Sequence, residues 1–188
     1  MKSNILRTDD FIKKFVTERQ ESFFKNDLKK FNVELDKSIS GKNVMVIGGA
    51  GTIGSSFIKA MLKFKVNKLC VIDINENGLT ELVRDLRSSE ELFVPDDIKT
   101  YPVNFGDNVF EKIFKKEGPF HIVANFAAHK HVRSEKDQFS IEAMIDNNVI
   151  KAKKLLELLW AFPPERFFCV LKDKAGNPVK GMGARKKE

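Results

Sequence analysis

The chain has 188 residues, of which 42% are hydrophobic and 31% are charged, a composition typical of one globular domain with a sizeable core. No apolar run approaches the ~18 residues of a membrane-spanning helix. Charges also interrupt every apolar stretch in the first 40 residues, unlike a secretory signal peptide. We therefore expect a cytoplasmic protein with no membrane segment.

The net charge of +7 is concentrated at the end of the chain, where residues 165–188 hold seven basic and three acidic groups. A nucleic-acid surface needs a basic stripe over a folded face, and the sequence shows none, so no nucleic-acid partner is expected. Cys70 and Cys169 each lie in an apolar run, which predicts two buried, reduced thiols. The three histidines show no metal-ligand spacing, and no metal site is predicted.

Residues 1–40 are predicted to form a helical N-terminal extension. Asp9 or Asp10 can cap its first helix, and the apolar residues recur at helical spacing, as Phe11, Ile12, Phe15 and Val16 and then as Phe23, Phe24, Leu28 and Phe31. The extension is either an arm for docking or oligomerisation, or a pair of helices that covers the domain's own core. The second interpretation is favoured, because amphipathic helices most often bury their apolar face within their own domain.

From residue 41 onward, short apolar runs alternate with helical segments. We expect strands at Val44–Ile47, Lys68–Ile72, Ile98–Val103, His121–Asn125 and Arg166–Leu171, and helices near 53–65, 77–88, 107–116 and 138–161. The strand runs are almost continuously apolar, as in strands covered on both faces. The alternation predicts an α/β fold with a doubly wound parallel sheet over residues 41–188.

A glycine-rich segment joins the first expected strand to the first helix of this sheet. It places glycines at Gly48, Gly51 and Gly54, with Thr52 and Ile53 opening the helix. Bare backbone N–H groups and the positive end of a helix dipole bind pyrophosphate, and glycines permit the tight turn and the close approach. The segment predicts a Rossmann-type dinucleotide site, with all five residues as cofactor contacts.

Asp73 ends the second expected strand, roughly twenty residues after the glycines. A carboxylate at this position accepts hydrogen bonds from the adenosine ribose and repels a 2′-phosphate, which favours NAD over NADP. The alternative is that Asp73 only caps the turn that follows.

Three later segments carry a resemblance to a known family: NFAAHKHV at 125–132, DNN at 146–148 and DKAGNP at 173–178. With the glycine spacing, they are similar to the extended short-chain dehydrogenases/reductases of the CapD-like polysaccharide biosynthesis family, which includes UDP-N-acetylglucosamine 4,6-dehydratases. The resemblance covers residues 41–188. It implies a UDP-linked hexose as substrate and NAD as a cofactor that takes hydride from C4, with loss of water across C5–C6 and return of the hydride to C6.

The resemblance also implies roles for individual residues. Asp173 would be the acid for the C6 hydroxyl and Lys174 the base at C5, while Lys186 would bind the nicotinamide ribose and Met182 would stand at the family's tyrosine position. Asn104 would meet the adenine, and Ala127 would also contact the cofactor. The substrate side would be formed by Lys130, His131, Asn147 and Asn177.

The chain departs from the family pattern at several of these positions. It has no Y-x-x-x-K motif, and the thioether of Met182 can neither donate nor accept a proton in catalysis. Lys172 replaces a threonine whose hydroxyl would have bonded the C4 oxygen, and the chain ends before the family's sugar-nucleotide lobe. The sequence therefore predicts a Rossmann domain incomplete at its C-terminal end, with little or no dehydratase activity of its own. A C4 epimerase and a non-catalytic NAD-binding module are the alternatives. Since family members often associate through helices, the resemblance also implies a homo-oligomer as a partner state.

Overall fold

The computed structural model describes residues 24–128 and 137–170, and the chain divides into two compact units, Met1–Ser38 and Ile39–Glu188. Helices α2 (Lys25–Lys30) and α3 (Asn32–Ile39) occupy the described part of the predicted extension. The helix expected around Phe11 lies outside the described residues. The interpretation of the extension therefore stays a prediction.

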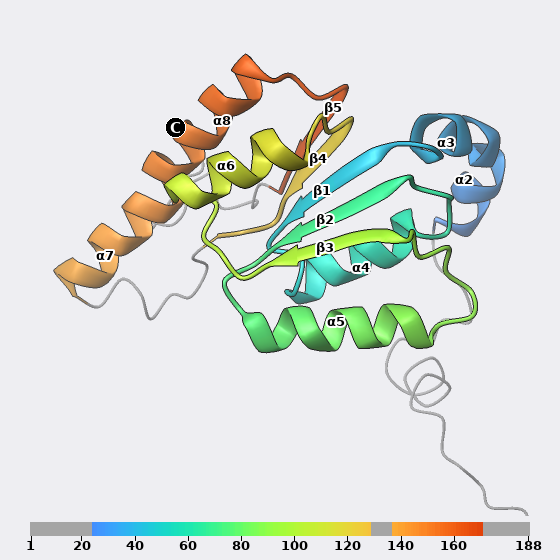
Figure 1. The fold of residues 1–188 in the computed structure, drawn as a ribbon, viewed down its shortest axis with the longest axis horizontal. Helices are drawn as coiled ribbons and strands as arrows, with labels where there is room; N and C mark the ends of the chain where they lie inside the picture. Colours follow the sequence, from blue (N-terminus) through green and yellow to red (C-terminus); the bar gives the residue numbers. More distant parts are fainter. Residues whose placement is uncertain (1–23, 129–136, 171–188) are drawn as a thin grey trace, which may run out of the picture. The chain divides into compact units, whose positions relative to one another are not determined.

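The second unit is built on a five-stranded parallel sheet in the order β3-β2-β1-β4-β5 (Figure 1). Its strands are β1 (Asn43–Ile47), β2 (Lys68–Ile72), β3 (Asp97–Tyr101), β4 (Ile122–Asn125) and β5 (Arg166–Cys169). The chain moves outward from β1 to β3 and then crosses back to β4. The strand order therefore reverses between β1 and β4, and ligands of such sheets bind beyond the carboxyl ends of the strands at that point.

Helices cover both faces of this sheet. Helices α4 (Thr52–Met61) and α5 (Glu76–Ser88) lie on one face, and α6 (Asn108–Glu117) and α8 (Lys151–Ala161) lie on the other (Figure 1). Helix α7 (Gln138–Ile145) joins α8 through a π-helical turn, η3 (Asp146–Ile150). The doubly wound parallel sheet predicted from the alternating pattern is confirmed.

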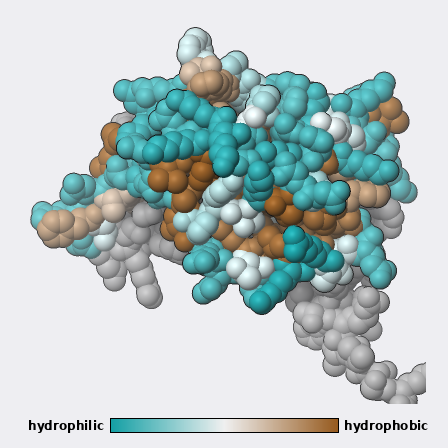
Figure 2. All heavy atoms as spheres, viewed as in Figure 1, coloured by the Kyte–Doolittle hydropathy of each residue, from teal (hydrophilic) through white to brown (hydrophobic). Residues whose placement is uncertain are grey.

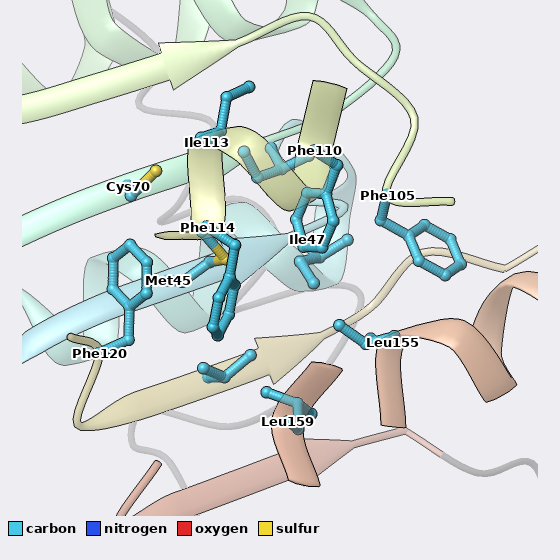
Figure 3. Close-up of a cluster of buried hydrophobic side chains, with 12 residues drawn as sticks. Met45, Ile47, Cys70, Phe105, Phe110, Ile113, Phe114, Phe120, Leu155 and Leu159 are labelled. Carbon is cyan, nitrogen blue, oxygen red and sulfur yellow. The ribbon is translucent and has the colours of Figure 1, made fainter. Parts of the chain in front are cut away.

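A hydrophobic cluster fills the space between the sheet and helices α6 and α8 (Figure 3). Figure 3 shows its side chains converging from both layers, among them Met45, Ile47, Cys70, Phe110, Phe114, Leu155 and Leu159. On the outer surface in Figure 2, hydrophilic residues predominate and hydrophobic ones are confined to patches between them. No helix among residues 24–128 and 137–170 is long and apolar enough to cross a membrane.

A charged cluster inside this layer ties α6 to β2 and β3. The Glu117 side chain is only 3% exposed, and it accepts hydrogen bonds from Lys68 Nζ and Lys99 Nζ, each at 2.7 Å, and from the Tyr101 hydroxyl at 2.8 Å. The two lysine hydrogen bonds lower the pKa of Glu117 to about 2, against the opposing effect of burial. Burial, and then the bond to Glu117, raise the pKa of Tyr101 to about 12. The Glu117 carboxylate therefore stays ionised at neutral pH.

Three expectations need correction. Strand β3 ends at Tyr101 rather than Val103, because the Val103 N–H, the next donor in line toward β2, turns back to the Tyr101 carbonyl at 2.9 Å. The single helix expected over 138–161 is interrupted by η3. Cys70 is buried as expected, but Cys169 is exposed, because it lies on β5 at the edge of the described sheet.

Candidate functional site

The turn between β1 and α4 is built from close backbone contacts that only glycine allows. Gly48 has φ +76°, and a Cβ added there would lie 2.6 Å from the Ala127 backbone nitrogen, at the end of β4. A Cβ on Gly54 would collide with the Gly48 carbonyl oxygen and would lie 2.8 Å from Gly49 Cα. The glycines thus press the turn against both β4 and the first turn of α4.

Gly51 differs from these two glycines because open space lies beside it. Its φ is −73°, and an added Cβ would meet only the Gly48 carbonyl oxygen, at 3.4 Å. Gly51 is also the N-cap of α4, where it offers no side chain to the first N–H groups of the helix, and no acidic residue stands in that first turn. The free N–H groups and the helix dipole therefore face a space that can receive an anion.

Asp73 connects this turn to the next helix. Its Oδ2 accepts the Ala50 N–H at 3.0 Å, and its Oδ1 accepts the Asn75 N–H, also at 3.0 Å. Asn75 in turn caps α5 by accepting the Gly78 N–H. Because an ionised carboxylate has about four acceptor positions, Asp73 can hold the glycine turn and still accept hydrogen bonds from a ribose.

These elements border a half-open cleft of about 190 Å³ beyond the carboxyl ends of the inner strands. The residues that line it come from the glycine turn, the ends of β1, β2 and β4, the loop after β3, and η3: Ile47, Gly48, Gly51, Ile72, Asp73, Ile74, Val103, Asn104, Phe105, Phe126, Ala127, Ala128 and Asn147. The cleft lies at the point where the strand order reverses.

Two asparagines from different elements line the cleft. Asn104 accepts the Gly106 N–H through Oδ1 at 3.0 Å, which shapes the loop after β3. Asn147 is 6% exposed, lies in η3, and donates from Nδ2 to Asn148 Oδ1 at 3.2 Å. Single π-helical turns inside α-helices are frequent at functional sites, and here the turn places a buried amide at the cleft.

Asn125 has a role that the sequence did not reveal. Its side chain is buried at the end of β4, and its Oδ1 accepts the Ala127 N–H at 3.0 Å, the group against which Gly48 packs. Asn125 therefore fixes the β4 side of the glycine turn. The signal available in the sequence was an asparagine placed directly after an apolar run, where a buried amide needs a hydrogen-bond partner.

The structure brings together Gly48, Gly51, Asp73, Asn104, Ala127 and Asn147 around one cleft, with Thr52, Ile53 and Gly54 in the first turn of the adjoining helix. The other predicted site residues lie outside the described residues: Lys130, His131, Asp173, Lys174, Asn177, Met182 and Lys186. Within residues 24–128 and 137–170, no group of three or more His, Cys, Asp or Glu side chains could hold a metal ion.

A parallel sheet in this order, with a glycine turn after β1, defines a Rossmann-type fold. A family model described as polysaccharide biosynthesis protein matches residues 44–188. The chain belongs to that family, and its CapD-like character, expected from the motifs, is confirmed.

Individual proteins are similar to the chain in sequence or in fold. The chain is 35% identical over 147 residues to an uncharacterized membrane protein of Methanocaldococcus jannaschii, a match that covers 77% of this chain and 40% of the relative. It is 24% identical to a UDP-N-acetylglucosamine 4,6-dehydratase (inverting) of Campylobacter jejuni over 148 residues, 78% of this chain and 41% of that enzyme. The fold is similar to that of the Bordetella bronchiseptica enzyme WbmF in complex with NAD+ and UDP, with a TM-score of 0.56 and 23% identity over 79% of this chain and 43% of WbmF. The chain thus spans about 40% of the length of these proteins.

Proposed function

We propose that the cleft binds NAD, with the pyrophosphate on the turn between β1 and α4. The observation that carries this proposal is the contrast between the glycines: Gly48 and Gly54 are crowded by backbone, whereas Gly51 faces open space at the amino end of a helix. A pyrophosphate fits there because its oxygens can accept hydrogen bonds from the N–H groups of Thr52 and Ile53.

The remaining described residues fit the adenosine half of the dinucleotide. Asp73 would accept hydrogen bonds from the ribose hydroxyls, and its charge would disfavour a 2′-phosphate. Asn104 would meet the adenine through its amide, beside the apolar surface of Ile74 and Val103. Ala127 would contact the cofactor on the β4 side, and Lys186 would bind the nicotinamide ribose, as the family resemblance implies.

Isothermal titration calorimetry with NAD tests this site, and Gly51→Ala is the decisive variant. The added methyl group meets no crowding in the protein, and the lower helix-capping preference of alanine is offset by a less flexible unfolded chain, so the free energy of unfolding should change little. The methyl group would nevertheless occupy the space of the phosphates, and we expect at least a roughly ten-fold loss of NAD affinity, about 1.4 kcal/mol. Unchanged NAD affinity in a folded Gly51→Ala protein would show that the phosphates do not bind at this turn.

We further propose that the chain is the cofactor-binding part of a nucleotide-sugar 4,6-dehydratase that acts on a UDP-N-acetylglucosamine-like substrate. The proposal is supported by the family, by the C. jejuni relative and by the DKAGNP segment at 173–178. A bound nicotinamide would supply reversible hydride transfer at the sugar. Lys174 would remove the C5 proton and Asp173 would protonate the departing C6 hydroxyl, while Lys130, His131, Asn147 and Asn177 would hold the substrate.

Product analysis by NMR in D₂O tests the reaction and separates it from a C4 epimerisation. A 4,6-dehydratase exchanges the C5 proton with solvent and gives a 4-keto, 6-deoxy product, whereas an epimerase leaves C5 protonated and C6 hydroxylated. We expect the 188-residue chain to bind NAD with little or no turnover of UDP-N-acetylglucosamine, and a polypeptide of the relatives' length to give the keto product. Cytoplasmic location and homo-oligomer formation stay predictions, tested by cell fractionation and by sedimentation.

A further inference from the structure

Lys151, the first residue of α8, lies directly on the loop that follows β3. A Cβ added to Gly106 would collide with Cγ and Cδ of Lys151 and would lie 2.7 Å from its Cβ. The aliphatic part of the lysine side chain therefore packs against bare backbone, in a contact that any side chain at residue 106 would disrupt.

The same lysine closes the π-helical turn η3. Its backbone N–H donates to the Asp146 carbonyl, and its Nζ lies 3.2 Å from Asp146 Oδ2. Asn147 follows Asp146 within this turn and lines the cleft. One residue thus contacts both the turn that carries Asn147 and the loop that carries Asn104.

We propose that Lys151 is a positioning residue that holds these two walls of the cleft at a fixed separation. The loop side of the connection is rigid, because the Gly106 N–H donates to Asn104 Oδ1 and the Asp107 N–H donates to the Asn104 carbonyl at 3.1 Å. The effect on nucleotide affinity rests on the proposed function, since Asn104 and Asn147 border the cleft assigned to NAD. The contact between Lys151 and Gly106 does not depend on it.

The aliphatic part of the lysine, rather than its charge, carries this role. The side chain of Lys151 is 21% exposed, but that of Asp146 is 50% exposed, and an ion pair open to solvent on one side contributes little. The methylene groups lie against the loop and are withdrawn from water. Lys151→Met keeps most of that packing, whereas Lys151→Ala removes it.

Calorimetric titration with NAD separates these variants. Without the lysine side chain, the loop would populate conformations that misplace Asn104, and the apparent affinity falls with the competent fraction. We expect Lys151→Ala to lose roughly ten-fold in NAD affinity, and Lys151→Met to stay within about two-fold of the parent. Lys153→Ala is the matched control, because Lys153 is 75% exposed on the same helix. Equal losses for Lys151→Met and Lys151→Ala, or no loss for either, would overturn the proposal.

A double variant tests the contact itself. Gly106→Ala alone forces its methyl group into the Lys151 side chain and should weaken NAD binding. Combined with Lys151→Ala, the two most severe collisions, with Cγ and Cδ, are removed and only the contact with the Cβ of residue 151, at 2.7 Å, remains, so the relief is partial. The double variant should therefore bind NAD more tightly than Gly106→Ala alone. If the losses of NAD affinity in the two single variants simply add in the double variant, the proposed packing of Lys151 against Gly106 is excluded.

Hydrogen exchange of the nucleotide-free chain distinguishes failure of this inference from failure of the proposed function. Lys151→Ala should accelerate exchange of the Gly106 and Asp107 amides, and Lys151→Met should not. If the parent chain did not bind NAD, the proposed function would fall while this exchange pattern would still support the positioning role. Unchanged exchange in Lys151→Ala would refute the positioning role even if NAD binds.

Discussion

Replacing Glu117 by glutamine should cost the domain a large share of its stability. The carboxylate is buried and accepts hydrogen bonds from two ammonium groups and one phenol, and the depression of its pKa from an ordinary 4.5 to about 2 corresponds to about 3 kcal/mol. The amide introduced by Glu117→Gln carries no charge to balance Lys68, whose side chain is only 11% exposed. Losing one partner of a buried pair typically costs about 3–5 kcal/mol, in agreement with this magnitude.

The measurement is urea unfolding followed by circular dichroism at several pH values. Tryptophan fluorescence is a poor probe here, because the single tryptophan, Trp160, is 89% exposed. Since the folded-state pKa of Glu117 lies below its unfolded value, its contribution is complete above about pH 4.5 and is lost as the pH falls toward 2. The stability difference between the parent and Glu117→Gln should therefore shrink over that range.

Glu111→Gln is the matched control for this prediction. Glu111 lies on the same helix and pairs with Lys115, but both side chains are about half exposed, so no measurable loss is expected. A loss below about 1 kcal/mol for Glu117→Gln at pH 7, or a difference that does not change between pH 7 and pH 3, would refute the reasoning.

Three further predictions concern single residues. Gly54→Ala should lower both stability and NAD affinity, because its methyl group meets backbone that cannot move aside; a normal melting temperature would contradict the close packing of the turn. Asp73→Asn should weaken NAD binding and narrow the preference for NAD over NADP, because the charge that repels a 2′-phosphate is removed. Parallel titrations with the two cofactors measure this preference, and an unchanged preference would show that Asp73 does not set it. In the native chain a thiol reagent should modify Cys169 and spare Cys70, whose pKa burial raises to about 12, until the chain is unfolded; rapid reaction of both thiols, counted by mass spectrometry, would show that Cys70 is accessible.

The sequence was sufficient to predict the parts of the fold that follow from local patterns. Continuous apolar runs such as Val44–Ile47 mark strands buried on both faces, and the glycine spacing marks the turn that follows. The end of β3 differs from the expected Val103 by two residues, because the turn of the Val103 N–H back to the Tyr101 carbonyl has no signature in the sequence.

The features that the sequence did not reveal depend on contacts between distant segments. The ion pairs of Glu117 require the register that sets Lys68 beside Asp97 and the placement of α6 above it. The π-helical turn at Asp146 has no residue signature, since DNN reads as ordinary helix. Cys169 was expected inside because its run is apolar, and only the strand order shows that β5 is at the edge.

The most direct test of the nucleotide site is titration of the ¹⁵N-labelled chain with NAD, followed by amide chemical shifts. The largest shifts should occur at Gly51, Thr52 and Ile53, at Asp73, and in the loop that carries Asn104, with small shifts at the remote end of the sheet near Glu117. Saturable shifts in this pattern would establish that the turn between β1 and α4 holds the pyrophosphate. An absence of shifts at millimolar NAD, or shifts centred elsewhere, would contradict the central claim.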